Sequence, residues 1–262
     1  MTQMNITNEN YDTQWGQLCL SARQLPGEHQ ELLPGVKWGD CSQLYTPAFW
    51  KMQYLSHTQV DSSNIIYKLG ASILEEIVVC LLGGFGMPSD IGIAAFERLK
   101  RENLIRQYVS FEEIHDALCL PYFLKDGRKV TYRFHNQKSR YIHAFLNRND
   151  LNEIPLKDDI QFRNWLLTIK GIGLKTASWI TRNWLNSENV AILDIHILRA
   201  GILAGFYTEK TDDLNKHYLY LEKQYLAFCS ALEVSSAIMD AIIWDFMKKT
   251  NRLALSALKH LN

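Results

Sequence analysis

The chain has 262 residues, enough for one large domain or two small ones, and 47% of them are hydrophobic. Its 28 basic and 28 acidic residues balance, which excludes the strongly basic type of protein that coats nucleic acid along its whole surface. No apolar run approaches the roughly 18 residues of a membrane span, and the polar N-terminus lacks a signal core. We therefore expect a cytoplasmic protein with no membrane contact and no obligate protein partner.

Helical periodicity dominates the chain, and we predict a mostly α fold. The first 60 residues show no clear pattern, so we treat 1–60 as an N-terminal segment of uncertain structure and 61–262 as the main domain. Helices are predicted over 71–82, 89–100, 110–119, 138–147, 161–170, 174–185, 196–205, 213–232, 235–249 and 252–261. One segment, 128–134, suits a short strand or an extended crossing. We expect two helical lobes around a cleft.

The cysteines do not indicate a metal centre. The five of them are far apart and never form a Cys-x-x-Cys pair: Cys19, Cys41, Cys80, Cys119 and Cys229. No group of Asp, Glu and His has convincing ligand spacing either. We therefore expect reduced thiols and no metal site, and a metal-dependent nuclease is a poor interpretation.

Basic residues gather in two segments although the total charge is zero. Residues 123–148 hold seven basic residues against Asp126, and residues 162–206 hold five against Glu188 and Asp194. A local basic face is sufficient for contact with phosphates. A solvated helix surface is an equally good interpretation of 123–148 taken alone.

The most informative stretch is 162–185. Phe162, Trp165, Leu166 and Ile169 share one helical face, and the run Lys170-Gly171-Ile172-Gly173 then interrupts the helix before a second one starts. This pattern predicts a helix–hairpin–helix in which Ile172 fills the core beneath the turn. The unsatisfied N–H groups at the start of the second helix can bind a phosphate without reading base sequence. An ordinary helical hairpin with a glycine turn is the alternative.

Two ionisable residues near this hairpin suggest chemistry. Lys175 lies in the first turn of the second helix, where the positive end of the helix dipole disfavours the charged amine and favours a nucleophile. Asp194 follows the apolar run 190–193 and precedes a new helix, which is typical of an N-cap. The same position could also direct its carboxylate toward Lys175.

The segments IKGIGLKTA and VAILDIHILR together resemble the helix–hairpin–helix DNA glycosylase superfamily. A lysine two positions after the second glycine is similar to the 8-oxoguanine DNA glycosylase/AP lyase branch, and in particular to its small prokaryotic members. EEIVVCLLGG, NQKSRYIHAF and MDAIIWDFMKKT are similar to further helices of that family. The resemblance covers about residues 65–250, while residues 252–262 run beyond the usual end of the small enzymes.

The resemblance implies that the protein binds double-stranded DNA and acts in the nucleoid. Lys175 would attack C1′ of the deoxyribose and form a Schiff base, and Asp194 would stabilise the developing positive charge. The DNA backbone would be held by Lys170, Gly171, Ile172, Gly173, His196 and Arg199. A monovalent ion at the hairpin is the one cofactor that the family suggests.

The base-recognition residues follow from the same resemblance. Trp244 would stack on a base flipped out of the duplex, Asp240 would hydrogen-bond its edge, and Phe85 or Met87 would wedge into the gap. Trp179 stands where the eukaryotic enzymes have a cysteine, which changes the shape of the pocket. The leading substrate is 8-oxoguanine; another lesion, or a hypermodified base of foreign phage DNA, is the first alternative. A non-catalytic hairpin module that only binds DNA is the second.

Overall fold

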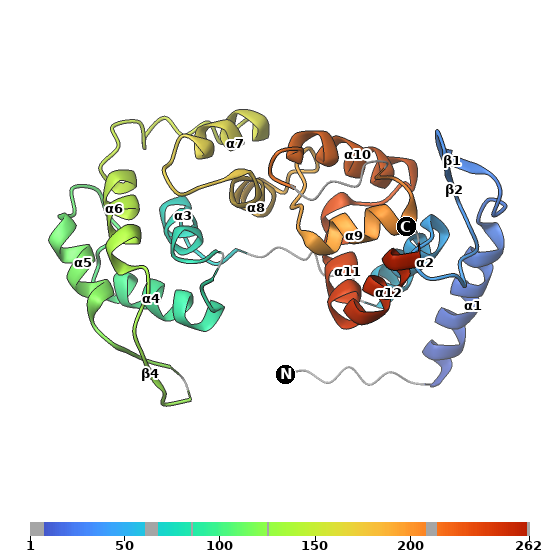
Figure 1. Cartoon of the computed structure of the whole chain (residues 1–262), viewed down its shortest axis with the longest axis horizontal. Coiled ribbons are helices and arrows are strands. Elements are labelled where there is room, and N and C mark those ends of the chain that lie inside the picture. The colour runs from blue at the N-terminus through green and yellow to red at the C-terminus, as the bar shows by residue number, and fades with distance from the viewer. Residues whose placement is uncertain (1–7, 61–67, 85, 125, 208–213, 261–262) are drawn as a thin grey trace. The chain divides into compact units, whose positions relative to one another are not determined.

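A computed structural model describes residues 8–60, 68–84, 86–124, 126–207 and 214–260. These residues form twelve helices and two short antiparallel sheets of two strands each (Figure 1). The mostly α class predicted from the sequence is therefore confirmed. The chain divides into two compact units, the first made of Met1–Ile65 with Ala191–Asn262 and the second of Ile66–Val190. The predicted wedge residue Phe85 lies outside the described residues.

The first unit combines both ends of the chain. Its elements are α1 (Asn8–Gln24), β1 (Glu31–Leu33), β2 (Val36–Lys37), α2 (Pro47–Val60), α9 (Ile195–Ala204), α10 (Tyr218–Ala231), α11 (Ser236–Lys249) and α12 (Asn251–His260). Aromatic packing joins α2 to α11: the ring centroid of Phe246 lies 5.0 Å from that of Phe49 and 5.6 Å from that of the fully buried Trp50. The segment 1–60, set apart in the sequence analysis, thus contributes α2 to a core shared with α11.

The second unit is built around one buried helix. Its elements are α3 (Ile73–Leu82), α4 (Ser89–Arg101), α5 (Phe111–Cys119), β3 (Tyr122–Phe123), β4 (Lys129–Val130), α6 (His135–Leu146), α7 (Asp159–Leu167) and α8 (Leu174–Leu185). In α3, Ile77, Val78 and Leu82 are completely buried, and the helix packs against α4, α6 and α8. This packing fixes α8, the second helix of the predicted helix–hairpin–helix, and α6, whose Tyr141 lies against Gly171.

Several predicted boundaries are corrected by the structure. The helix predicted over 138–147 begins earlier, at His135, and the one predicted over 213–232 begins later, at Tyr218. The predicted strand 128–134 shrinks to Lys129–Val130, paired with Tyr122–Phe123 across a short loop. These errors arise at element ends, where periodicity is weakest and tertiary packing decides.

No single helix among the described residues is long and apolar enough to cross a membrane. Together, α10 and α11 have the length and apolar composition of a membrane span, but the two helices are bent by 104° relative to each other.

Candidate catalytic and nucleic-acid site

The predicted helix–hairpin–helix is present as α7, a glycine turn and α8. Phe162 and Leu166 of α7 are fully buried, and Ile172 at the turn is 7% exposed and joins the same core. Gly171 has φ +98°, and a Cβ built on it would overlap the ring of Tyr141. Glycine is therefore required at 171 for backbone conformation and for space alike.

The N-terminus of α8 is open. Gly173 occupies the N-cap position and supplies no side-chain hydrogen bond, and its own carbonyl accepts the first helical bond from Ala177 at 2.9 Å. A Cβ at Gly173 would meet nothing within 4 Å. The amide groups of the first turn of α8 are thus free of a side-chain cap, which suits them to an external anion.

Lys175 lies in that first turn and is exposed. Its amine makes no hydrogen bond or ion pair with any residue in the described part of the chain, so it is accessible to a substrate. Trp179 follows one helical turn later and packs, half-buried, against the core of the second unit. Met87, the other candidate wedge, packs partly against the same core.

A basic pocket adjoins the hairpin, and the sequence analysis missed how it is assembled. Its lining is contributed by α6 and the turn: Asn136, Gln137, Arg140, Tyr141, Ala144 and Lys170. The amines of Lys138 and Lys170 lie 5.9 and 5.8 Å from the centroid of the Tyr141 ring. Burial lowers the pKa of Lys138. The basic segment 123–148 was a signal for this pocket, but the sequence does not show that α6 lies against Gly171.

In the first unit, Asp194 is the N-cap of α9, as the sequence predicted. Its Oδ1 accepts hydrogen bonds from the backbone N–H of His196 at 2.8 Å and of Ile197 at 3.0 Å. Its Oδ2 has no hydrogen-bond partner among the described residues. Capping therefore fixes the orientation of the carboxylate and leaves one oxygen available for another role.

The predicted base-pocket residues also belong to the first unit. The rings of His196 and Trp244 meet edge to face with centroids 6.4 Å apart, and the amine of Lys248 lies 4.5 Å from the Trp244 centroid. Trp244 is 42% exposed, whereas Asp240, one turn earlier on α11, is buried. Arg199 donates to Asn251 Oδ1 at 2.7 Å and so ties α9 to α12.

The predicted site residues therefore fall into two sets. The second unit holds Lys170, Gly171, Ile172, Gly173, Lys175 and Trp179, and the first holds Asp194, His196, Arg199, Asp240 and Trp244. Within the first unit, the structure brings His196 and Trp244 into contact. Within the second, the turn residues and Lys175 adjoin each other on one hairpin.

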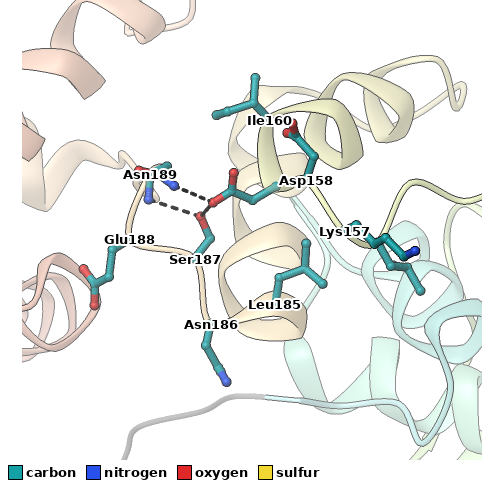
Figure 2. A pocket seen from close by; sticks show the side chains of 10 residues that line it. Lys157, Asp158, Ile160, Leu185, Asn186, Ser187, Glu188 and Asn189 are labelled. Carbon is teal, nitrogen blue, oxygen red and sulfur yellow. Dashed lines mark hydrogen bonds between the residues drawn. The ribbon is translucent and has the colours of Figure 1, made fainter.

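A separate pocket lies at the opposite end of the α7–α8 pair, where α7 begins and α8 ends (Figure 2). Its volume is about 630 Å³, and no predicted site residue lines it. Ser187 and Asn189 donate hydrogen bonds to the Asp159 carboxylate. Burial raises the pKa of Asp159, but these hydrogen bonds outweigh it and the pKa is lowered. Asp159, Ser187 and Asn189 are thus bound to one another at the wall of this pocket.

Two amphipathic helices joined by a glycine turn, with an uncapped helix N-terminus and an exposed lysine in its first turn, define a helix–hairpin–helix protein. The family model described as 8-oxoguanine DNA glycosylase matches residues 62–234. The chain therefore belongs to the 8-oxoguanine DNA glycosylase family.

Two curated relatives agree with this assignment. The chain is 31% identical to an 8-oxoguanine DNA glycosylase/AP lyase of Metallosphaera sedula, over 68% of this chain and 82% of that protein. It is 31% identical to the 8-oxoguanine DNA glycosylase/AP lyase of Saccharolobus solfataricus, with the same two coverages. The crystal structure of the 8-oxoguanine DNA glycosylase of Thermotoga maritima aligns with a TM-score of 0.49 at 26% identity, over 67% of this chain and 79% of that one.

Proposed function

We propose that this chain is a bifunctional DNA glycosylase/AP lyase that excises 8-oxoguanine from double-stranded DNA through a Schiff base on Lys175. The observation that carries the proposal is the exposed amine of Lys175 in the first turn of α8, which has no partner among the described residues and lies beside an open anion site. Family membership adds support, because the curated relatives bear the name of that activity.

The chemistry assigns one role to each of two residues. Lys175 Nζ attacks C1′, the glycosidic C–N bond breaks, and the base leaves with a proton while the sugar opens to an imine. Asp194 Oδ2 stabilises the positive charge that develops on the sugar before the imine forms. Loss of the 3′ phosphate by β-elimination then cuts the strand. Asp194 can serve in this way because capping of α9 occupies its Oδ1 alone.

The DNA backbone is held by the hairpin. The uncapped amides at the start of α8 donate hydrogen bonds to a phosphate, and Lys170 and Arg140 supply positive charge from the adjoining pocket. A monovalent ion bound by the carbonyl groups of the turn would fit on the Gly173 side, where a Cβ would meet no atom of the described residues within 4 Å. His196 and Arg199 contribute the second set of backbone contacts.

The flipped base is read by Trp244 and Asp240. Trp244 offers a partly exposed ring on which a base can stack, and the buried Asp240 lies one turn before it on α11. Trp179 is larger than the cysteine that the eukaryotic enzymes carry at this place, which favours testing other bases beside 8-oxoguanine.

A panel of duplexes, each carrying one modified base, tests this proposal. We expect release of 8-oxoguanine with strand cleavage, loss of both in Lys175→Gln, and retention of both in Lys157→Gln, an exposed lysine outside the site. Release of a different base would change the proposed substrate but would still support the Schiff-base mechanism. Binding to every duplex without release of any base would instead indicate a non-catalytic hairpin module.

A further inference from the structure

Three side chains of metal-ligand type converge where α5 ends and α6 begins. His115 and Cys119 lie one helical turn apart on α5, and His135 is the first residue of α6. One potential ligand atom from each lies within 4.8 Å of the other two, and all three residues are half-buried. None of them belongs to the catalytic or DNA-contacting set described above.

The best-defined distance in this cluster suits a zinc ion. Cys119 Sγ lies 3.4 Å from His115 Nε2. With a Zn–S bond of about 2.3 Å and a Zn–N bond of about 2.0 Å, tetrahedral coordination separates the sulfur and nitrogen by about 3.5 Å. The pair therefore needs almost no movement to hold one ion between them. The i, i+4 spacing on α5 places both ligands on the same helical face.

Each histidine has an oxygen beside its Nδ1, as histidines that bind metals through Nε2 do. His135 Nδ1 lies 3.1 Å from the carbonyl oxygen of Tyr132 and must donate to it, which leaves the lone pair on Nε2. His115 Nδ1 lies 3.5 Å from the Asp116 carboxylate, a pairing that supports coordination through Nε2. Asn136 Oδ1 accepts a hydrogen bond from His115 Nε2–H at 2.9 Å. On metal binding this proton would shift to Nδ1, beside Asp116, and the amide oxygen would remain next to the ion.

We propose that His115, Cys119 and His135 bind one Zn²⁺ ion, with Asn136 Oδ1 or a water molecule as the fourth ligand. A thiol and two imidazoles select a borderline-soft ion over Mg²⁺ or Ca²⁺, which require oxygen ligands. Binding forms a Zn–S bond and releases the thiol proton of Cys119 to solvent, without any change of oxidation state.

The ion would fasten α5 to the first turn of α6. That turn also supplies Asn136 and Gln137 to the basic pocket beside the hairpin. Metal binding would thus stabilise the second unit and hold the pocket in shape, whatever base the protein acts on.

Cobalt titration of the protein without an affinity tag tests the site. Co²⁺ serves as the probe because thiolate coordination gives a near-ultraviolet charge-transfer band. We expect this band to saturate at one equivalent, to disappear on addition of one equivalent of Zn²⁺, and to be absent in Cys119→Ser. The control Cys41→Ser, a half-buried thiol of the first unit, should keep the band at full intensity.

The histidine ligands need their own variants. His115→Ala and His135→Ala should each weaken Co²⁺ binding at least about tenfold, as loss of a ligand does. Far-UV circular dichroism checks that each variant is folded. If one is not, X-ray absorption on the zinc-loaded wild type gives the ligand set directly, and we expect one sulfur with three nitrogen or oxygen atoms.

The proposal is overturned if wild type shows no thiolate band at several equivalents of Co²⁺, or if the band survives in Cys119→Ser. If His135→Ala binds Co²⁺ with unchanged affinity, His135 is not a ligand and the three-ligand site is refuted. Zinc coordination without sulfur would refute it as well.

Discussion

Replacement of Gly171 by alanine should damage the hairpin far more than the same replacement at Gly173. Gly171 has φ +98°, and the new methyl group would overlap the Tyr141 ring. Left-handed backbone costs an L-residue about 1–2 kcal/mol, and overpacking costs about 1–3 kcal/mol. Alanine also restricts the unfolded chain more than glycine does, which stabilises the folded state by about 0.4–1 kcal/mol. We therefore expect Gly171→Ala to lower the free energy of unfolding by about 2–4 kcal/mol.

Gly173→Ala is the matched control. Gly173 has φ −101°, and its Cβ would enter open space. Alanine is a poorer N-cap than glycine, which destabilises the fold, but it restricts the unfolded chain, which stabilises the fold. The free energy of unfolding should therefore change by less than about 1 kcal/mol. Urea denaturation followed by far-UV circular dichroism measures both variants, and hydrogen exchange of residues 162–185 locates the effect.

A double variant separates the steric part from the backbone part. Because the Tyr141 ring is the obstacle, Gly171→Ala combined with Tyr141→Ala should cost less than the sum of the two single changes. Equal losses in Gly171→Ala and Gly173→Ala, together with simple additivity in the double variant, would refute the assigned role of Gly171.

Three further changes test the remaining assignments. Asp194→Asn keeps a good N-cap, so the free energy of unfolding should change by less than about 1 kcal/mol. The rate of single-turnover excision should nevertheless fall at least about a hundredfold. If turnover persists, Asp194 serves only as the N-cap of α9. Trp244→Ala should lower kcat/KM for excision about 5- to 150-fold, the equivalent of about 1–3 kcal/mol of base stacking, and leave binding to an abasic duplex nearly unchanged. Hydrogen bonds from Arg148, with one from Trp165, lower the pKa of Asp150 from 3.8 to about 2. Because the pKa of Asp150 is lower in the folded state, its ionised form stabilises the fold at pH values above its pKa in the unfolded chain, and this stabilisation is lost as the pH falls toward the folded pKa. In urea titrations at different pH values, wild type should therefore lose more stability than Asp150→Asn between about pH 4 and pH 2.

Local sequence signals predicted the hairpin correctly. The apolar spacing of α7, the two glycines and the restart at Leu174 are all short-range features, and the structure confirms them. The capping role of Asp194 was predicted for the same reason, because an acid before a helix acts on amides two and three residues ahead.

Features that depend on distant segments were not predictable in this way. The helix α2 escaped notice because its buried aromatic residues pack against Phe246, almost two hundred positions away, and not on a regular stripe. The basic pocket needs α6 beside Gly171, which the sequence does not reveal. The histidine–cysteine cluster was missed because a search for paired cysteines ignores one thiol, and its third member arrives only after the β3–β4 hairpin.

Borohydride trapping tests the central claim most directly. The protein is incubated with a duplex containing 8-oxoguanine, reduced, digested and analysed by mass spectrometry. We predict a covalent DNA adduct on Lys175 in wild type and in Lys157→Gln, and no adduct in Lys175→Gln that still binds the duplex. An adduct that persists in Lys175→Gln, or maps to another residue, would contradict the account.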